Sequence, residues 1–188
     1  MSANAGARNE VNVQTIRESY GRVVYSHKTH EKAREIESTK ADMAKWVNIT
    51  LVTLTSGTLL TALVSDQRVL LYISSIVSAL ALAFIVFQLS FSPEKAAEQH
   101  RATAKELWLI REKYVHLLAD VETGAANVDI RRRRNELIEE LNHIYRLAPD
   151  TSSKAYRAAQ RALQINEDMT FSDEELDRML PAALRAAR

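Results

Sequence analysis

The stretch Val69-Leu-Leu-Tyr-Ile-Ser-Ser-Ile-Val-Ser-Ala-Leu-Ala-Leu-Ala-Phe-Ile-Val-Phe87 decides the fold of this chain. It lies in a run of 25 residues, Val69–Pro93, that contains no Asp, Glu, Lys or Arg. A helix of about 20 residues crosses the hydrocarbon core of a bilayer, and a helix that is apolar on every face is surrounded by protein or by lipid. Because 188 residues are too few to wrap such helices in protein, we expect a transmembrane helix over 69–92.

A second uncharged run, Trp46–Ser65, precedes the first and is 20 residues long. It is rich in Thr and Ser, whose hydroxyls can bond back to a carbonyl of the preceding helical turn, so a bilayer tolerates them. We expect a transmembrane helix over 46–65. Only Asp66, Gln67 and Arg68 separate the two runs, so the two spans must form an antiparallel hairpin. A buried hairpin in a soluble protein is the alternative.

The orientation of the hairpin follows from the basic residues near its ends, because Lys and Arg accumulate on the cytoplasmic side of a membrane. The connecting turn carries only Arg68, and the N-terminus lacks the basic-then-apolar order of a cleaved signal peptide. We therefore expect a multi-pass protein of the cell membrane with both termini in the cytoplasm. The basic residues that flank the spans are Lys28, Lys32, Arg34, Lys40 and Lys45 before, and Lys95, Arg101, Lys105, Arg111 and Lys113 after.

The composition of the whole chain favours helix, and the residues outside the two uncharged runs are polar. The chain has 25 Lys plus Arg, 24 Asp plus Glu, no Cys, and only seven Gly and Pro. The absence of Cys excludes disulfides and thiolate chemistry, and the near-neutral balance argues against direct nucleic-acid binding. We expect an all-α membrane protein, with a disordered segment over 1–10, a cytoplasmic helix over 11–45 and a cytoplasmic helical region over 94–188.

The cytoplasmic parts are predicted to be long amphipathic helices on both sides of the hairpin. Apolar residues recur every three or four positions after Pro93, and Gly124 suits the end of that helix. We expect Asp129 to cap the next helix, and Ser172 with Glu175 to form a capping box. The apolar stripes are narrow, so we expect a loose bundle or one completed by other copies. The stripe after Pro93 comprises Thr103, Leu107, Ile110, Tyr114, Leu117 and Val121.

Small residues recur every four positions within each span and so share one helix face. Such ridges let the backbones of membrane helices approach each other. Three interpretations stay open: packing of the two spans of one chain, contact between protomers, or a hydroxyl-bearing pore wall. No charged residue or His lies inside the spans, which argues against a proton relay or a charged selectivity ring. The ridges are Thr53, Gly57 and Thr61 in the first span, and Ser75, Ala79 and Ala83 in the second.

Two further groups of residues could carry chemistry. His27, His30 and His100 form a possible polar cluster; a zinc site is the weaker interpretation, because no His-Glu-x-x-His pattern supports it. Arg131 and Arg134 could contact anionic lipid headgroups or an anionic nucleotide. No nucleotide-binding or hydrolase motif is present. We expect no enzyme activity, no catalytic residue, no cofactor and no resident metal.

The order of four segments resembles that of the SLATT family, small two-helix membrane effectors of bacterial conflict systems. The likeness covers Tyr20 to Pro181, most of the chain. The segments are Tyr25-Ser-His-Lys-Thr-His-Glu-Lys32, His100-Arg-x-x-Ala-x-x-Leu-Trp-x-Ile-Arg-Glu-x-Tyr114, Tyr145-x-x-Ala-Pro-x-Thr-Ser-Ser-Lys-Ala-Tyr156 and Phe171-Ser-Asp-Glu-Glu175.

The resemblance implies an effector of bacterial antiphage defence that oligomerises and forms a pore or disrupts the inner membrane. It also implies a nearby gene for a nucleotidyltransferase that makes a second messenger, or for a reverse transcriptase. Membrane lipids and further copies of the chain are the other expected partners. The alternative function is a membrane anchor or scaffold that forms no pore and recruits a cytoplasmic partner enzyme.

Overall fold

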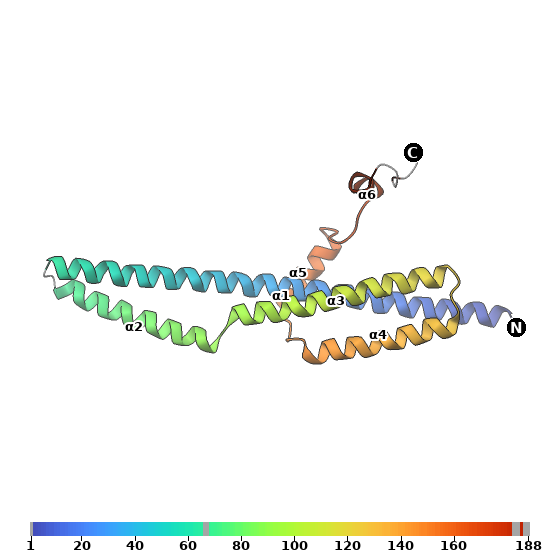
Figure 1. Ribbon diagram of the computed structural model, residues 1–188, viewed down its shortest axis with the longest axis horizontal. Coiled ribbons are helices and arrows are strands. Elements are labelled where there is room, and N and C mark those ends of the chain that lie inside the picture. The colour runs from blue at the N-terminus through green and yellow to red at the C-terminus, as the bar shows by residue number, and fades with distance from the viewer. Residues whose placement is uncertain (1, 66–67, 182–184, 186–188) are drawn as a thin grey trace.

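A computed structural model describes residues 2–65, 68–181 and 185, and every regular element in these ranges is an α-helix. The turn expected at Asp66 and Gln67 lies outside the described residues. Figure 1 shows an elongated molecule in which α2 and α3 follow one another along α1, and α5 and α6 project to one side. The helices are α1 (Ser2–Ser65), α2 (Arg68–Ser90), α3 (Pro93–Glu122), α4 (Asn127–Leu147), α5 (Ser153–Gln164) and α6 (Asp173–Met179).

The first helix, α1, is continuous over 64 residues, a length of about 96 Å at 1.5 Å per residue. No proline interrupts it. It begins at Ser2, within the segment 1–10 for which we expected disorder. It also passes without a break through residue 45, where we placed the boundary between a cytoplasmic helix and the first span. The division into cytoplasmic and membrane segments therefore stays a prediction. Both segments would belong to one continuous helix.

The chain breaks between α2 and α3, where Pro93 is the first residue of α3. A proline disfavours helical backbone in the residue before it and has no N–H to donate, so a helix ends before it and a new one can start on it. The intervening Ser92 has φ −96° and ψ 86°, outside the helical region. Pro93 thus terminates the apolar helix as expected, and the two segments pack along α1 one after the other.

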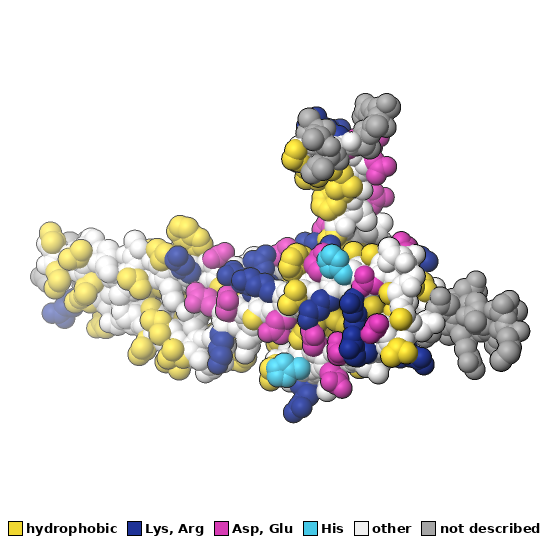
Figure 2. All heavy atoms as spheres, turned by 45° about the vertical axis from the view of Figure 1, so that its right-hand side comes forward, with side chains coloured by type: hydrophobic (Ala, Val, Ile, Leu, Met, Phe, Trp, Pro, Cys, Tyr) yellow, Lys and Arg dark blue, Asp and Glu magenta, His cyan; other side chains and the backbone are white. Residues whose placement is uncertain are grey.

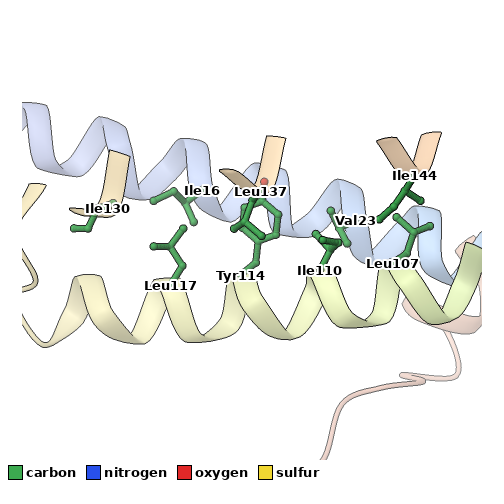
Figure 3. Close-up of a cluster of buried hydrophobic side chains, with 9 residues drawn as sticks. All are labelled: Ile16, Val23, Leu107, Ile110, Tyr114, Leu117, Ile130, Leu137 and Ile144. Atoms are coloured by element: carbon green, nitrogen blue, oxygen red, sulfur yellow. The ribbon is translucent and has the colours of Figure 1, made fainter. Parts of the chain in front are cut away.

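The hydrophobic core lies where α1, α3 and α4 meet, and Figure 3 shows its side chains from all three helices interdigitating. Tyr114, Leu107 and Ile16 are fully buried. The stripe expected in α3 is buried, and Val121 at its end is partly so. We call this half of the molecule the bundle: α1 up to Lys45, with α3, α4 and α5. The core comprises Ile16, Val23, Leu107, Ile110, Tyr114, Leu117, Ile130, Leu137 and Ile144.

The turn from α3 to α4 depends on Gly124, which has φ +86°. Its N–H donates to Val121 O at 3.2 Å, and the N–H of Ala125 donates to Asp120 O at 3.0 Å. This pair of bonds is a Schellman motif, which needs a left-handed residue that glycine adopts without strain. The expectation that Asp129 caps α4 is wrong: α4 starts at Asn127, so Asp129 lies in its first turn, where a carboxylate favours the positive helix end.

Serine side chains cap the two C-terminal helices, and the capping box expected at Ser172 and Glu175 is confirmed. Ser152 accepts a hydrogen bond from the N–H of Ala155 at the start of α5, and Ser172 and Glu175 form the full capping box of α6. Three alanines of α5 are buried, and α5 packs on α1. Their small side chains let α5 lie close to α1. The buried alanines are Ala155, Ala159 and Ala162.

The other half of the molecule is an apolar arm, formed by Trp46–Ser65 of α1 together with α2. Both the arm part of α1 and α2 are long and apolar enough to cross a membrane. In the most apolar 18-residue stretch of each, only 6 % and 11 % of the residues, respectively, are buried inside the protein. Core helices of a soluble protein would be mostly buried. In Figure 2 the arm is mostly yellow and white, with dark blue at its far end, while charged side chains gather over the bundle. The expectation of a buried soluble hairpin therefore finds no support.

Candidate functional site

The two helices of the apolar arm run antiparallel and meet through polar contacts as well as apolar ones. Near the tip of the arm, Ser74 Oγ donates to Thr58 Oγ1 at 2.7 Å. Near the bundle, Asn48 Nδ2 donates to Gln88 Oε1 at 2.9 Å, and Gln88 Nε2 donates to the carbonyl oxygen of Ala44 at 3.2 Å. In surroundings this apolar, such bonds fix the register of one helix against the other. We did not single out Asn48 or Gln88 from the sequence.

The threonines of the arm satisfy their hydroxyl groups within their own helix. Each of Thr53, Thr55 and Thr61 donates to the carbonyl oxygen four residues earlier, at 2.7 to 2.8 Å. Ser75 does the same in α2 at 2.9 Å. This is the back-bonding that lets a bilayer accept Thr and Ser. The exposed hydroxyls therefore do not require water beside them.

The six small residues of the two ridges are all exposed. They are Thr53, Gly57, Thr61, Ser75, Ala79 and Ala83. A Cβ built on Gly57 would meet no other atom of the described residues within 4 Å, apart from its own turn of helix, so none of them packs on that face of α1. The seam between the helices instead contains Ala62 and Ser74, which are buried, and Thr58. The expectation that the ridges pack the two spans of one chain together does not hold. Contact between protomers and a pore wall stay predictions.

The junction between arm and bundle contains an apolar cleft of about 450 Å³. Phe84 and Phe87 of α2 line it together with Phe91, which follows the helix, and successive rings stack with centroids 6.5 and 4.8 Å apart. Lys40 lines the same cleft and pairs with Glu37 at 2.6 Å. An apolar hollow edged by charge suits the depth at which acyl chains give way to headgroups.

The three histidines expected to form a polar cluster lie buried at the interface of α1 and α3. His30 Nδ1 and His100 Nδ1 are 3.0 Å apart, with ring centroids 5.2 Å apart. His27 Nδ1 lies 2.9 Å from the carbonyl oxygen of Ala104. A carbonyl only accepts, so His27 Nδ1 carries the hydrogen; between His30 and His100 one ring donates and the other accepts. In the described part of the chain, no three His, Asp or Glu side chains are placed to hold a metal ion.

Burial makes the His30–His100 pair resist protonation. Desolvation lowers the pKa of His30 to about 4, and repulsion from His100 and His27 acts in the same direction. Desolvation also lowers the pKa of His100, although the nearby Glu37 carboxylate opposes this. Both rings are therefore neutral at physiological pH. A hydrogen bond between two imidazole nitrogens needs at least one neutral ring, because that ring supplies the accepting nitrogen.

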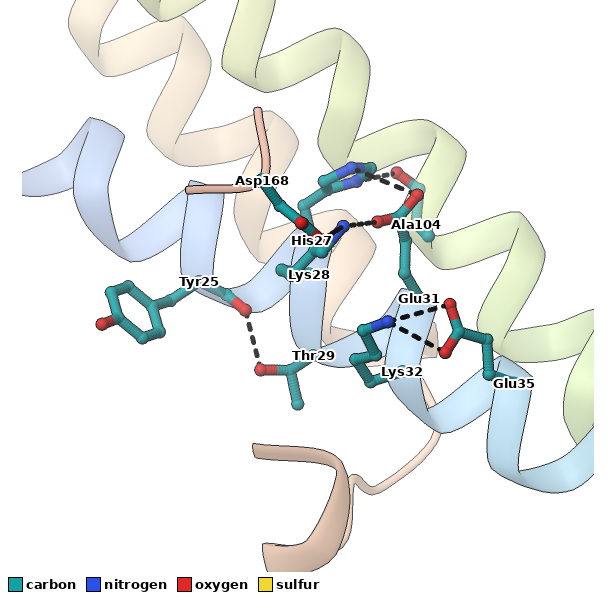
Figure 4. Close-up of polar contacts among 9 residues, drawn as sticks. All are labelled: Tyr25, His27, Lys28, Thr29, Glu31, Lys32, Glu35, Ala104 and Asp168. Atoms are coloured by element: carbon teal, nitrogen blue, oxygen red, sulfur yellow. Dashed lines mark hydrogen bonds and ion pairs between the residues drawn. The ribbon is translucent and has the colours of Figure 1, made fainter. Parts of the chain in front are cut away.

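The segment after α5 is tied to α1 through Lys28, which is buried beside the histidines. Lys28 Nζ lies 3.0 Å from Glu31 Oε2 and 3.0 Å from Asp168 Oδ2, and Figure 4 shows its ammonium between the two carboxylates. Burial opposes the charge, but the bonds to Asp168 and Glu31 outweigh it and raise the pKa of Lys28. Gln164 Nε2 adds a bond to the Tyr25 hydroxyl at 2.6 Å. These contacts connect α5 and the segment after it to α1.

The arginine run of α4 faces solvent for the most part. Arg131 is exposed and its Nε donates to Asn127 O at 3.3 Å, whereas Arg134 is half-buried towards the core. Between them, Arg132 pairs with Asp129, and Arg133 pairs with Asp120 of α3. The run therefore helps to join α4 to α3. Whether Arg131 and Arg134 contact lipid or an anion stays a prediction.

Comparison with curated proteins and with solved structures found no match. The profile of SMODS and SLOG-associating 2TM effector domain family 4 matches residues 13–175, which includes both helices of the apolar arm and nearly all of the bundle. That family is a membrane effector type associated with bacterial conflict systems and not a known enzyme family. The chain therefore belongs to the SLATT family, as its sequence segments indicate.

Proposed function

We propose that this protein is a membrane effector of bacterial antiphage defence. The apolar arm spans the inner membrane as a hairpin, and the bundle and both termini lie in the cytoplasm. A signal, either a nucleotide or a partner protein, acts on the bundle, and copies of the chain then assemble through their arms. Assembly forms a pore or disrupts the bilayer, and no enzymatic step is involved. The second-messenger nucleotidyltransferase or reverse transcriptase encoded nearby is the expected source of that signal.

The observation that carries the proposal is the exposed surface of the arm. Its apolar windows are only 6 % and 11 % buried, and the small-residue faces of both helices point away from the helix seam. Lipid can cover the large apolar side chains, whereas a face of small residues suits close approach of another helix. The continuity of α1 supports the coupling, because one unbroken helix connects the bundle to the first span. The expected orientation adds to this, with ten basic residues flanking the spans and Arg68 at the turn.

The test is controlled expression in bacteria together with the neighbouring genes, and a dye that reports the membrane potential. The proposal expects the potential to collapse once the defence system is triggered, in step with loss of viable cells. An intact potential in triggered, dying cells would contradict it.

Gly57→Leu tests whether the small-residue face assembles copies. Because a Cβ at Gly57 would meet none of the described residues beyond its own turn of helix within 4 Å, the larger side chain should leave the monomer folded and block only close approach between copies. We expect loss of depolarisation and of cross-linked oligomers. The matched control is Ser56→Leu, which adds the same side chain at an exposed position about 100° around the helix. Normal killing by Gly57→Leu would refute assembly through this face.

The alternative function is a passive anchor that recruits a cytoplasmic partner, and the exposed apolar side chains of the bundle favour it. Trp108 and Leu109 of α3 and Ile138 of α4 are each about half exposed, at 49 %, 50 % and 53 %. Replacing the arm with an unrelated two-span anchor separates the two functions. A passive anchor would keep its activity after the exchange, whereas an effector that acts through the arm would lose it.

A further inference from the structure

A cleft of about 600 Å³ lies between α1 and α3 beside the buried histidines. Each helix lines it with residues at positions i, i+4 and i+7, which share one helix face. The two faces oppose each other because His27 contacts Ala104 and His30 contacts His100 across the same interface. The lining residues are His27, Glu31 and Arg34 from α1, and Arg101, Lys105 and Trp108, with Ala104, from α3.

The charge of this cleft is mostly positive and incompletely neutralised. Arg101 pairs with Glu98 at 3.3 Å, and the one carboxylate in the lining, Glu31, already pairs with Lys28. Within the ranges that the structure describes, Arg34 and Lys105 have no ion-pair partner. Unpaired cations that converge on a hollow favour a bound anion, above all one that a guanidinium can contact through two oxygens.

The cleft also has an apolar end. Trp108 is 49 % exposed although it lies within the bundle, and its indole lines the hollow. The antiparallel register places Arg34 and Arg101 towards the arm and Trp108 about one helical turn beyond Lys105. From Arg101 to Trp108 the lining extends about 10 Å along α3, a length that accommodates a phosphate at one end and a planar ring at the other.

We propose that this cleft binds a soluble organic phosphate that carries an aromatic ring, the chemistry of a nucleotide. Arg34, Arg101 and Lys105 contact the phosphate oxygens, and the ring stacks on Trp108. His27 takes no part in the phosphate contacts, because its Nδ1 donates to Ala104 O and its Nε2 lies 3.7 Å from Glu31 Oε1. The proposal that the cleft binds such a ligand is argued from its geometry alone. The further step, that the trigger acts at this cleft, rests on the proposed function.

The position of the cleft favours a soluble phosphate over a lipid headgroup. Arg34 precedes Trp46, the first residue of the uncharged span, by 12 residues, or about 18 Å along α1. Lys105 follows Pro93 by 12 residues, the same distance along α3. Both side chains therefore lie beyond the headgroup layer if the arm spans the bilayer.

The test is binding of three probes to the full chain in lipid nanodiscs: ATP, a cyclic dinucleotide and inorganic pyrophosphate. Trp46→Phe removes the only other tryptophan, so the fluorescence reports Trp108. We expect ATP or the cyclic dinucleotide to quench Trp108, and pyrophosphate to compete without quenching. Arg34→Gln and Lys105→Gln should each raise the dissociation constant about tenfold or more. The matched control, Arg157→Gln, removes an exposed charge from α5 and should change it little.

Three results would overturn the proposal. The first is no binding of any probe, and the second is an equal loss of affinity in Arg157→Gln, which would mean attraction to the overall charge. The third is binding that requires anionic lipid in the nanodisc and vanishes in zwitterionic lipid, which would assign the cleft to headgroups. If the probes bind as expected in nanodiscs but triggered cells keep their membrane potential, the binding site stands and the proposed function fails.

Discussion

Acidification should destabilise the bundle through His30, and replacing this residue should remove part of that effect. In the folded protein burial lowers the pKa of His30 to about 4, against an ordinary value of 6.5 for histidine. Between these values the unfolded chain binds the proton and the folded chain does not. The free energy of unfolding therefore falls as the pH falls through this window.

The magnitude follows from the two pKa values. Since one pKa unit corresponds to about 1.4 kcal/mol, the full shift is worth about 3 kcal/mol once the pH is well below 4. Lowering the pH from about 7.5 to about 5.5 should remove about 1.3 kcal/mol through His30, before most carboxylates titrate. His100 adds to the loss, because burial lowers its pKa as well.

The assay is denaturant-induced unfolding of the detergent-solubilised chain, followed by tryptophan fluorescence across that pH range. His30→Gln keeps a hydrogen-bonding side chain opposite His100 but cannot titrate, so its stability should depend less on pH than that of the unmodified chain by about 1.3 kcal/mol. The control His143→Gln changes an exposed histidine of α4 and should retain the original profile. Equal pH dependence of His30→Gln and the unmodified chain would refute the role of this buried histidine.

Three other substitutions test the packing of the bundle. Leu107→Ala should lower the free energy of unfolding by about 2–5 kcal/mol, because Leu107 is fully buried; a loss under 1 kcal/mol in the same denaturant titration would place it outside the core. Gly124→Ala should cost about 1 kcal/mol through strain at φ +86°, and an unchanged midpoint of thermal unfolding would argue against the Schellman turn. Asp168→Asn should weaken the contact with Lys28 and speed hydrogen exchange in α5; unchanged exchange would show that the buried alanines alone hold this helix.

The helices could be predicted from the sequence because their signals are local. Uncharged runs, apolar residues at helical spacing, Pro93, Gly124 and the Ser172–Glu175 box each act within one or two turns. Asp129 shows the limit of this reasoning. A carboxylate can cap a helix or lie in its first turn, and only the geometry of the preceding Schellman turn decides between them.

The contacts between helices could not be predicted with the same certainty. The rotation of α2 about its own axis decides whether Ser74 or the neighbouring Ser75 faces α1, and both faces of the helix are apolar enough to serve. Asn48 and Gln88 are 40 residues apart, so their bond depends on the register of the whole arm. The pairing of His30 with His100 likewise needs α3 to continue along α1 after the break at Pro93.

The topology of the chain is the most direct test of the account. The sequence has no cysteine, so a single introduced thiol reports one position only. Arg68→Cys lies at the start of α2 and Ser153→Cys at the start of α5, both at exposed positions. In intact spheroplasts a membrane-impermeant maleimide should label Arg68→Cys and reach Ser153→Cys only after lysis. Labelling of both thiols, or of neither, before lysis would contradict a two-span hairpin with the bundle in the cytoplasm.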